Sequence, residues 1–275
     1  MDQSRPKITV IVPTGNRKDV IEDCLRSVRW ADELIVVDSF SEDGTYDIAE
    51  KYADRILQNH YGYSAKQKNW AIPQAKHEWI LIVDTDERIP EALQTEIVEA
   101  IAGQTQYKGY RIPRQNYFLG KEIKHAGYSP DFQVRLFCKD AAVYADRKVH
   151  AHLQVDGLIG TLKSPMVHYA HRSLNQTISN LLITMTTWEA EQRQKEIINA
   201  GKSPRRWIKA NILLRPVAAF WLRFIKQGGW RDGLHGLVLS FIWALYVAIT
   251  YMKVWEIYLT LPDEWWVGHW EDNKK

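Results

Sequence analysis

The N-terminal part of the chain alternates short apolar runs with stretches in which apolar positions recur every three or four residues. The runs are rich in Val and Ile, as in strands that are buried on both faces of a parallel sheet. We expect strands at Lys7–Val12, Glu33–Asp38, Arg55–Gln58 and Glu78–Val83. Between and after them we expect helices at Asn16–Trp30, with Asn16 as the N-cap, and at Thr45–Tyr52, Ser64–Gln74 and Pro90–Gly103. This order predicts β-α-β units on a mostly parallel sheet.

The pattern of predicted elements changes further along the chain. Residues Lys108–Val167 are β-rich and irregular, and Ser173 can cap a long helix that ends near Gly201. After Pro204 come two basic, apolar segments that are interrupted at Pro216 and again at Gly228-Gly229. We therefore predict an α/β domain over residues 1–172 and a helical region over residues 173–275.

Composition excludes several classes of protein. With 275 residues, of which 45% are hydrophobic, the chain has enough apolar surface for a sizeable core and is not disordered. Only two cysteines are present, Cys24 and Cys138, which excludes a disulfide scaffold and fits a reducing compartment. The N-terminus lacks the apolar core of a signal peptide.

The charge distribution says more than the net charge of +3. The stretch from Lys202 to Arg231 contains eight basic residues and no acidic one. Apolar residues at positions 217, 220, 221, 224 and 225 form a helical stripe beside these charges. Basic residues next to such a stripe are typical of a helix that lies on an anionic membrane surface, and their interleaving with Trp, Phe and Leu argues against nucleic acid as the partner.

Two alternatives to this peripheral membrane role stay open. The stripe can instead pack on the core of the protein. The segment Gly233–Met252 has about the length of a bilayer span, so a single C-terminal span is the other alternative. We expect the protein at the cytoplasmic face of the membrane, in the peripheral mode.

The residues that indicate chemistry are Asp84-Thr85-Asp86, directly after the predicted strand EWILIV. Ligands of open α/β sheets bind beyond the carboxyl ends of the strands. Two carboxylates at that edge can hold Mg²⁺ or Mn²⁺, which would neutralise charge on a diphosphate leaving group. Asp38 ends another predicted strand and should flank the same crevice, while Lys68 on the helix between them can face phosphates.

These residues lie in a pattern that resembles the family 2 glycosyltransferases with the GT-A fold. The matching segments are VIVPTGNR (Val10–Arg17), VVDSFSEDGT (Val36–Thr45), AKQKNWA (Ala65–Ala71), WILIVDTDER (Trp79–Arg88), SPDFQVRLF (Ser129–Phe137) and VH (Val149–His150). The C-terminal pattern LLRPVAAFWLRFIKQGGWRDGLHGL narrows the resemblance to the lipopolysaccharide-core β-1,4-glucosyltransferases. The resemblance implies an inverting transferase that moves a sugar, a hexose carried by UDP, to a lipid-linked or lipopolysaccharide-type acceptor.

The resemblance also implies roles for single residues. Pro13 and Thr14 would contact the nucleotide base, Asp38 the base or ribose, and Arg17 and Lys68 the nucleotide. Asp84 and Asp86 would bind the metal, with Asp86 the more direct ligand and Asp84 also facing the nucleotide. Arg135 would lie near the diphosphate or the acceptor.

Two positions depart from the family pattern. The family commonly has an aromatic residue that stacks on uracil where this chain has Gly15, and the subgroup commonly has His-Glu where this chain has His150-Ala151. If that glutamate is the general base, the candidates left here are Asp131, His150 and His152, and we favour Asp131. The same departures motivate the alternative of a non-catalytic sugar-nucleotide-binding or scaffold protein. A nucleotidyltransferase is disfavoured, because PTGNRKD is a poor version of its Gly-rich basic loop.

Overall fold

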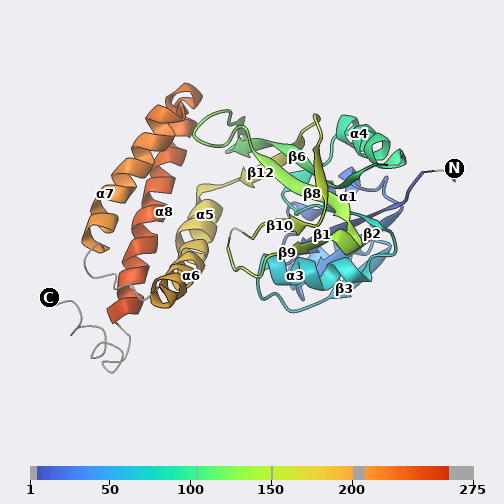
Figure 1. Ribbon diagram of the computed structural model, residues 1–275, viewed down its shortest axis with the longest axis horizontal. Coiled ribbons are helices and arrows are strands. Elements are labelled where there is room, and N and C mark those ends of the chain that lie inside the picture. Colours follow the sequence, from blue (N-terminus) through green and yellow to red (C-terminus); the bar gives the residue numbers. More distant parts are fainter. Residues whose placement is uncertain (1–4, 104, 150, 201–207, 260–275) are drawn as a thin grey trace. The chain divides into compact units, whose positions relative to one another are not determined.

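The computed structural model describes residues 5–103, 105–149, 151–200 and 208–259 (Figure 1). They form two compact units. The first unit comprises the chain up to Glu122 and Ser129–Ala170, and the second comprises Ile123–Tyr128 and the chain from His171 onward. The division into domains at residue 172 stays a prediction.

The first unit is built on a sheet with the strand order β3-β2-β1-β4-β8-β6-β12-β5. The neighbours β3, β2, β1 and β4 are parallel, whereas β8 runs antiparallel to both β4 and β6. The predicted α/β architecture is confirmed, with a largely antiparallel half beside the parallel strands. The bounds are β1 (Ile8–Thr14), β2 (Glu33–Asp38), β3 (Arg55–Gln58), β4 (Trp79–Ile82), β5 (Glu87–Arg88), β6 (Tyr107–Phe118), β7 (Lys121–Glu122), β8 (Phe132–Cys138), β9 (Ala142–Tyr144), β10 (Leu153–Val155), β11 (Leu158–Thr161) and β12 (Met166–His171).

The helices of the first unit follow the predicted order, with one correction at the start of α1. Asn16 was expected to cap this helix, but its backbone is left-handed, with φ of 52°, and its side-chain oxygen accepts from the N–H of Glu42. Asparagine tolerates this conformation, so it shapes a turn here, and the helix begins only at Ile21. The bounds are α1 (Ile21–Ser27), α2 (Thr45–Ala49), α3 (Ser64–Ala71), η1 (Ile72–Gln74), α4 (Glu91–Ala102) and η2 (Lys139–Ala141).

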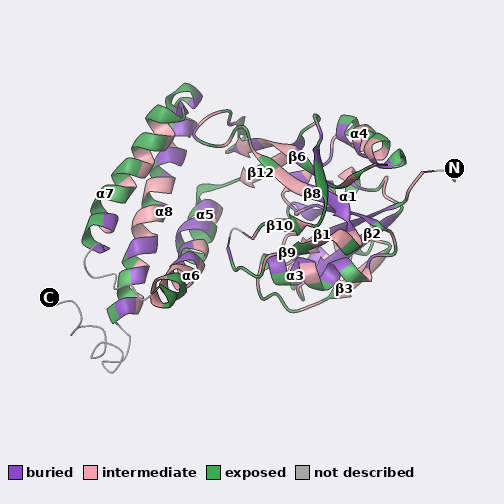
Figure 2. Ribbon diagram, in the orientation of Figure 1, coloured by how far each residue is buried: buried purple, intermediate pink, exposed green. Residues whose placement is uncertain are grey.

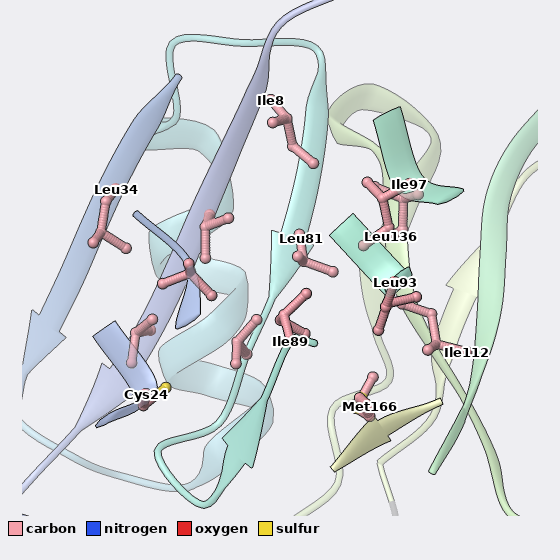
Figure 3. Packing of buried hydrophobic residues seen from close by; sticks show 14 of the residues in the cluster. Ile8, Cys24, Leu34, Leu81, Ile89, Leu93, Ile97, Ile112, Leu136 and Met166 are labelled. Atoms are coloured by element: carbon pink, nitrogen blue, oxygen red, sulfur yellow. The ribbon is translucent and has the colours of Figure 1, made fainter. Parts of the chain in front are cut away.

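The parallel strands β1, β2 and β4 are buried on both faces, which explains their apolar runs, whereas the edge strand β3 is only partly buried (Figure 2). Alternate side chains point to opposite faces. Val10 and Leu81 belong to one apolar cluster, part of which Figure 3 shows. Ile11 and Ile82 belong to another, together with Ala65 of α3. Burial of both faces fixes the strand register and with it the edge at which the strands end.

The second unit is helical apart from short connections. Ser173 caps its first helix as predicted, since its hydroxyl oxygen accepts from the N–H of Gln176 at 3.2 Å. The predicted break at Pro216 is wrong: α7 continues through this residue. A proline removes only one backbone hydrogen bond, and α7 is held along α8 by packing. The bounds are α5 (Leu174–Thr177), the π-helical turn η3 (Ile178–Met185), α6 (Thr186–Asn199), α7 (Ile208–Trp221), the π-helical turn η5 (Leu222–Lys226), η6 (Gly229–Asp232) and α8 (Leu234–Leu259).

The six-residue segment 123–128 is held by side chains of the helical unit. The N–H of His125 donates to Asp232 at 2.9 Å, and the N–H of Ala126 donates to the carbonyl of Gln227 at 3.0 Å. Arg223 donates to the carbonyl of Ala126 at 2.5 Å, and its guanidinium lies 4.0 Å from the ring centroid of Trp243. Burial lowers the pKa of Arg223. Arg223 is therefore part of the packing of this unit.

Several large apolar side chains of α7 and α8 are exposed. On α7 the exposed fractions are 68% for Leu213 and Val217 and 63% for Trp221, at a spacing of four residues. Among the described residues, α8 is the one helix that is long and apolar enough to cross a membrane, and 39% of its most apolar window is buried. Of the predicted stripe, Val217, Trp221 and Ile225 are exposed, whereas Phe220 and Phe224 are partly buried.

Candidate active site

The carboxyl ends of β1, β2 and β4 form the edge of the sheet where the predicted residues gather. Thr14 at the end of β1 pairs in register with Asp38 at the end of β2, and Asp84 follows β4 by two residues. The order β2-β1-β4 places Asp38 and Asp84 two strands apart, or about 10 Å. The parallel register thus brings both acids to one edge, as the pattern predicts.

Asp84 lies between two cations that come from different elements. Lys68 of α3 reaches one carboxylate oxygen at 2.8 Å, and Arg135 of β8 reaches the other at 2.5 Å. Both cations are buried, with 5% and 7% of the residue exposed. Burial alone would raise the pKa of Asp84, but Arg135 and Lys68 outweigh it and hold that pKa well below the usual range. Asp84 is therefore ionised, and both its oxygens are occupied by cations.

Glu87 is a site residue that the sequence reasoning missed. It is completely buried, and its carboxylate accepts from Arg135 at 2.6 Å and from the backbone N–H of Asp84 at 3.0 Å. Arg114 of β6 is the next cation, 3.7 Å away. A buried carboxylate requires such partners. The available signal was its place directly after the D-x-D triplet, in DTDER.

Asp131 is held by Arg114 and two amides. Arg114 donates to one carboxylate oxygen through two nitrogens, at 2.7 and 2.8 Å. Asn116 donates to the same oxygen at 3.0 Å and Gln133 to the other at 3.1 Å. Burial would raise the pKa of Asp131, but Arg114 and the amides lower it below the usual range. The lowered pKa keeps the carboxylate ionised and also makes it a weaker base. The role of Asp131 as general base stays a prediction.

Asp86 and His168 of β12 form the part of the site that fits a divalent cation. Asp86 keeps 41% of its side chain exposed, and one of its oxygens lies 3.8 Å from Nε2 of His168. The amide of Asn116 donates to Asp131, so its oxygen faces Nδ1 of His168, at 2.6 Å. Nδ1 is then the donor in this hydrogen bond, and Nε2 is the ring nitrogen on the side of Asp86.

Asp86 and His168 could supply two donor atoms to Mg²⁺ or Mn²⁺, and Asp86 as a metal ligand stays a prediction. Asp84 as a metal ligand stays a prediction, because Lys68 and Arg135 already hold its oxygens. Within the described parts of the chain, no group of three or more His, Cys, Asp or Glu side chains is arranged to hold a metal. Sequence reasoning had not connected His168 with Asp86, because the pairing of β12 with β5 brings these distant residues together.

The residues that are expected to contact the nucleotide differ in burial and in hydrogen bonding. Asp38 is fully buried, and its oxygens accept from the hydroxyl and the N–H of Ser41, at 2.5 and 3.0 Å, so it organises the loop after β2. The hydroxyl of Thr14 is buried and has no hydrogen-bond partner among the described residues. Pro13 and Arg17 are partly exposed beside it. A polar ligand group or a water would satisfy the Thr14 hydroxyl.

The structure says less about the two histidine candidates for the general base. His150 lies outside the described residues. His152 is exposed, and its carbonyl accepts from the N–H of Ala145 at 3.1 Å. Of the three candidates, Asp131 alone is seen joined to the network of Asp84, Glu87 and Asp86, through Arg114 and Asn116.

The sheet and the acids at its edge define the GT-A class of transferase fold. The model of the glycosyl transferase family 2 matches residues 9–151, and the chain belongs to this family. The match spans β1, the D-x-D triplet, Asp131 and Arg135. Transfer of a glycosyl group is the activity of this family.

Similar proteins extend over most of the chain. The lipopolysaccharide core biosynthesis glycosyltransferase LpsC of Rhizobium meliloti is 26% identical, over 88% of this chain and 89% of its own. An uncharacterized glycosyltransferase of Rickettsia bellii is 29% identical, over 92% and 87%. The crystal structure of S. aureus TarS 1-349 in complex with UDP-GlcNAc superimposes with a TM-score of 0.49 at 18% identity, covering 95% of this chain and 92% of that chain. The expected family is confirmed by the family match, and LpsC is a lipopolysaccharide-core glycosyltransferase, the kind of relative that the expected subgroup implies.

Proposed function

We propose that this protein transfers a hexose from a UDP-linked donor to a membrane-associated glycolipid of the lipopolysaccharide-core type, with inversion at the anomeric carbon. The observation that carries the proposal is the edge cluster, in which Asp84 is locked between Lys68 and Arg135 while Asp86 stays open beside His168. Similarity to LpsC over most of both chains supports the acceptor class.

The residues of the cluster have separate tasks in this proposal. Asp84 fixes Lys68 and Arg135 at the edge, so that their positive charge lies where a diphosphate carries negative charge. Asp86 and His168 would hold Mg²⁺ or Mn²⁺, which supplies charge neutralisation for the leaving diphosphate. Thr14 and Arg17 lie at the end of β1, on the side of the nucleotide.

Asp131 is the proposed base. Its carboxylate takes the proton of the acceptor hydroxyl, whose oxygen forms a bond to the anomeric carbon as the bond from that carbon to the diphosphate oxygen breaks. The nucleoside diphosphate leaves with the electron pair of the broken bond. Arg114 keeps Asp131 ionised and oriented through its two hydrogen bonds.

The acceptor class fits a peripheral position at the cytoplasmic face of the membrane. The exposed stripe of Leu213, Val217 and Trp221 on α7 offers an apolar face, and Lys209 at the start of the same helix is an exposed cation. Arg223, which packs against Trp243, is not part of this face. The remaining basic residues from 202 to 206 lie outside the described residues. Insertion of α8 as a single span is the alternative arrangement.

Release of nucleoside diphosphate tests the proposal. Incubated with UDP-glucose and Mn²⁺, the wild type should release UDP slowly by hydrolysis. Asp86→Asn should reduce that release by on the order of 10²-fold or more, since charge stabilisation of the leaving group is lost. The control is Asp47→Asn, which changes an exposed aspartate on α2 and should keep the wild-type rate.

Two outcomes would count against the proposal. A wild-type rate in Asp86→Asn would remove the metal site from this edge. A wild type that binds UDP-sugars and releases no UDP, with or without glycolipid, would favour the non-catalytic alternative.

A further inference from the structure

Two aromatic residues outside the acidic cluster are exposed at the same edge of the sheet. Phe40 follows β2 by two residues, and His60 follows β3 by two residues. Their ring centroids are 4.3 Å apart with the planes inclined by 30°, so the rings are in contact and tilted against each other. The exposed fraction of Phe40 is nevertheless 43%. A large aromatic side chain that is supported on one side and open to solvent on the other is a flat, unused apolar surface.

The backbone of Phe40 is held in a conformation that a bulky residue rarely adopts. Its φ is +57°, in the left-handed region that favours glycine or asparagine. Hydrogen bonds on both sides of Phe40 hold this conformation. The N–H of Ser39 donates to the backbone carbonyl of Thr14 at 3.0 Å, and the N–H of Ser41 donates to the carboxylate of Asp38 at 3.0 Å. Strained residues of this kind persist where the surroundings determine them, and they gather at ligand sites.

Gly15, the residue after β1, lies against the loop that carries Phe40. At Gly15 a Cβ would come within 3.2 Å of the Cβ of Ser39, so a larger side chain at residue 15 would crowd the loop that carries Phe40. The end of β1 therefore presents backbone at this place. The nearest ring surface comes from the loops after β2 and β3.

This surface lies within reach of the donor site. Tyr61, the residue after His60, is 52% exposed. Partial burial of its hydroxyl raises the pKa of Tyr61, the charge of Asp84 adds to the rise, and Arg17 opposes it. Ser39, next to Phe40, accepts from the side-chain amide of Gln67 on α3 at 3.2 Å, and the following residue, Lys68, holds Asp84 at 2.8 Å, so α3 connects the loop that carries Phe40 to the acidic cluster.

We infer that Phe40, supported by His60, is the stacking surface for the nucleobase of the donor. The inference rests on the proposed function, because it takes the donor to be a nucleoside-diphosphate sugar. Every nucleobase has a π face, so stacking provides affinity without selecting one base. Selection among bases then falls to polar groups such as the buried hydroxyl of Thr14.

The test is calorimetric titration of the full chain with UDP, CDP, GDP and ADP in the presence of Mg²⁺, and with inorganic pyrophosphate as the probe without a base. Phe40→Gly removes the ring and keeps the left-handed backbone without strain. It should weaken the tightest nucleotide about 5- to 150-fold, the range for loss of one stacked aromatic side chain, and leave pyrophosphate unchanged. Phe40→Trp should stay within about threefold of the wild type, because a ring remains.

Leu119→Gly is the matched control. Leu119 is also an exposed apolar residue with a left-handed backbone, at 39% exposure and φ of 48°, in the turn between β6 and β7. Its substitution should change no affinity. Nucleotide affinity in Phe40→Gly equal to the wild type would overturn the stacking assignment alone, as would an equal loss for pyrophosphate. A wild type that binds none of the four nucleotides would overturn the proposed donor class, and this inference with it.

Discussion

Arg135 offers the sharpest test of how the charged cluster is held together. Its guanidinium is 2.5 Å from Asp84 and 2.6 Å from Glu87. If Arg135→Met removes it, Asp84 keeps Lys68 and remains 31% exposed on its side chain. Glu87 is completely buried and is left with Arg114 at 3.7 Å. The cost therefore arises chiefly from an uncompensated buried carboxylate, which destabilises a protein by about 3–5 kcal/mol.

Urea denaturation followed by circular dichroism measures this loss. With a slope of about 3 kcal/mol per M, 3–5 kcal/mol corresponds to a fall of about 1–1.7 M in the unfolding midpoint. The double variant Arg135→Met/Glu87→Gln should recover more than half of the fall, because glutamine removes the charge and still accepts from the N–H of Asp84. Arg26→Met is the control: the Arg26–Glu22 pair is exposed, at 64% and 45%, so its loss should leave the unfolding midpoint nearly unchanged.

Either of two results would refute this reasoning. A midpoint shift below about 0.3 M in Arg135→Met would mean that Glu87 is not energetically dependent on Arg135. A double variant as unstable as the single one would assign the cost to lost packing rather than to charge.

Two further predictions concern the base and the membrane. Because the pKa of Asp131 is lowered, its carboxylate stays ionised as the pH falls. At saturating donor and metal, kcat should therefore hold from pH 8 to 5 and decline only below about pH 4. A decline centred near pH 6.5 that disappears in His150→Gln or His152→Gln would instead assign the base to that histidine. The triple change Leu213→Glu/Val217→Glu/Trp221→Glu should abolish flotation of the protein with anionic liposomes. The control Leu158→Glu, at an exposed apolar residue of the first unit, should not abolish it. Equal flotation of both variants would exclude α7 as the docking face.

The sequence pattern predicts the parallel half of the sheet closely, because strands buried on both faces have uninterrupted apolar runs with turn residues between them. β2 and β3 have the predicted bounds. The pattern fails where local preference competes with specific contacts, as at Asn16, which shapes a turn with Glu42 instead of capping a helix. It fails at Pro216 because packing against α8 outweighs the loss of one hydrogen bond.

The candidate site divides in the same way. Asp84 and Asp86 follow an apolar strand directly, so periodicity alone predicts their edge. Glu87 and Arg114 depend on antiparallel pairing between strands distant in sequence, which periodicity does not encode. Arg114 and Asn116 do alternate along β6 and so share a face, a signal that was available in RIPRQN. Their partner Asp131 becomes evident only once β6 and β8 are paired.

Because residues 123–128 are hydrogen-bonded to the helical unit, the protein is difficult to separate into two fragments. The chain passes between the two units after Glu122, after Tyr128 and after Ala170, so no single cut separates them. A truncated chain ending near residue 170 would retain His125 and Ala126 but lose Asp232, Arg223 and the carbonyl of Gln227. The backbone groups they satisfy would be left without partners in the loop that leads to Asp131. A soluble catalytic fragment is therefore better sought by changing the exposed face of α7 than by deleting the helices.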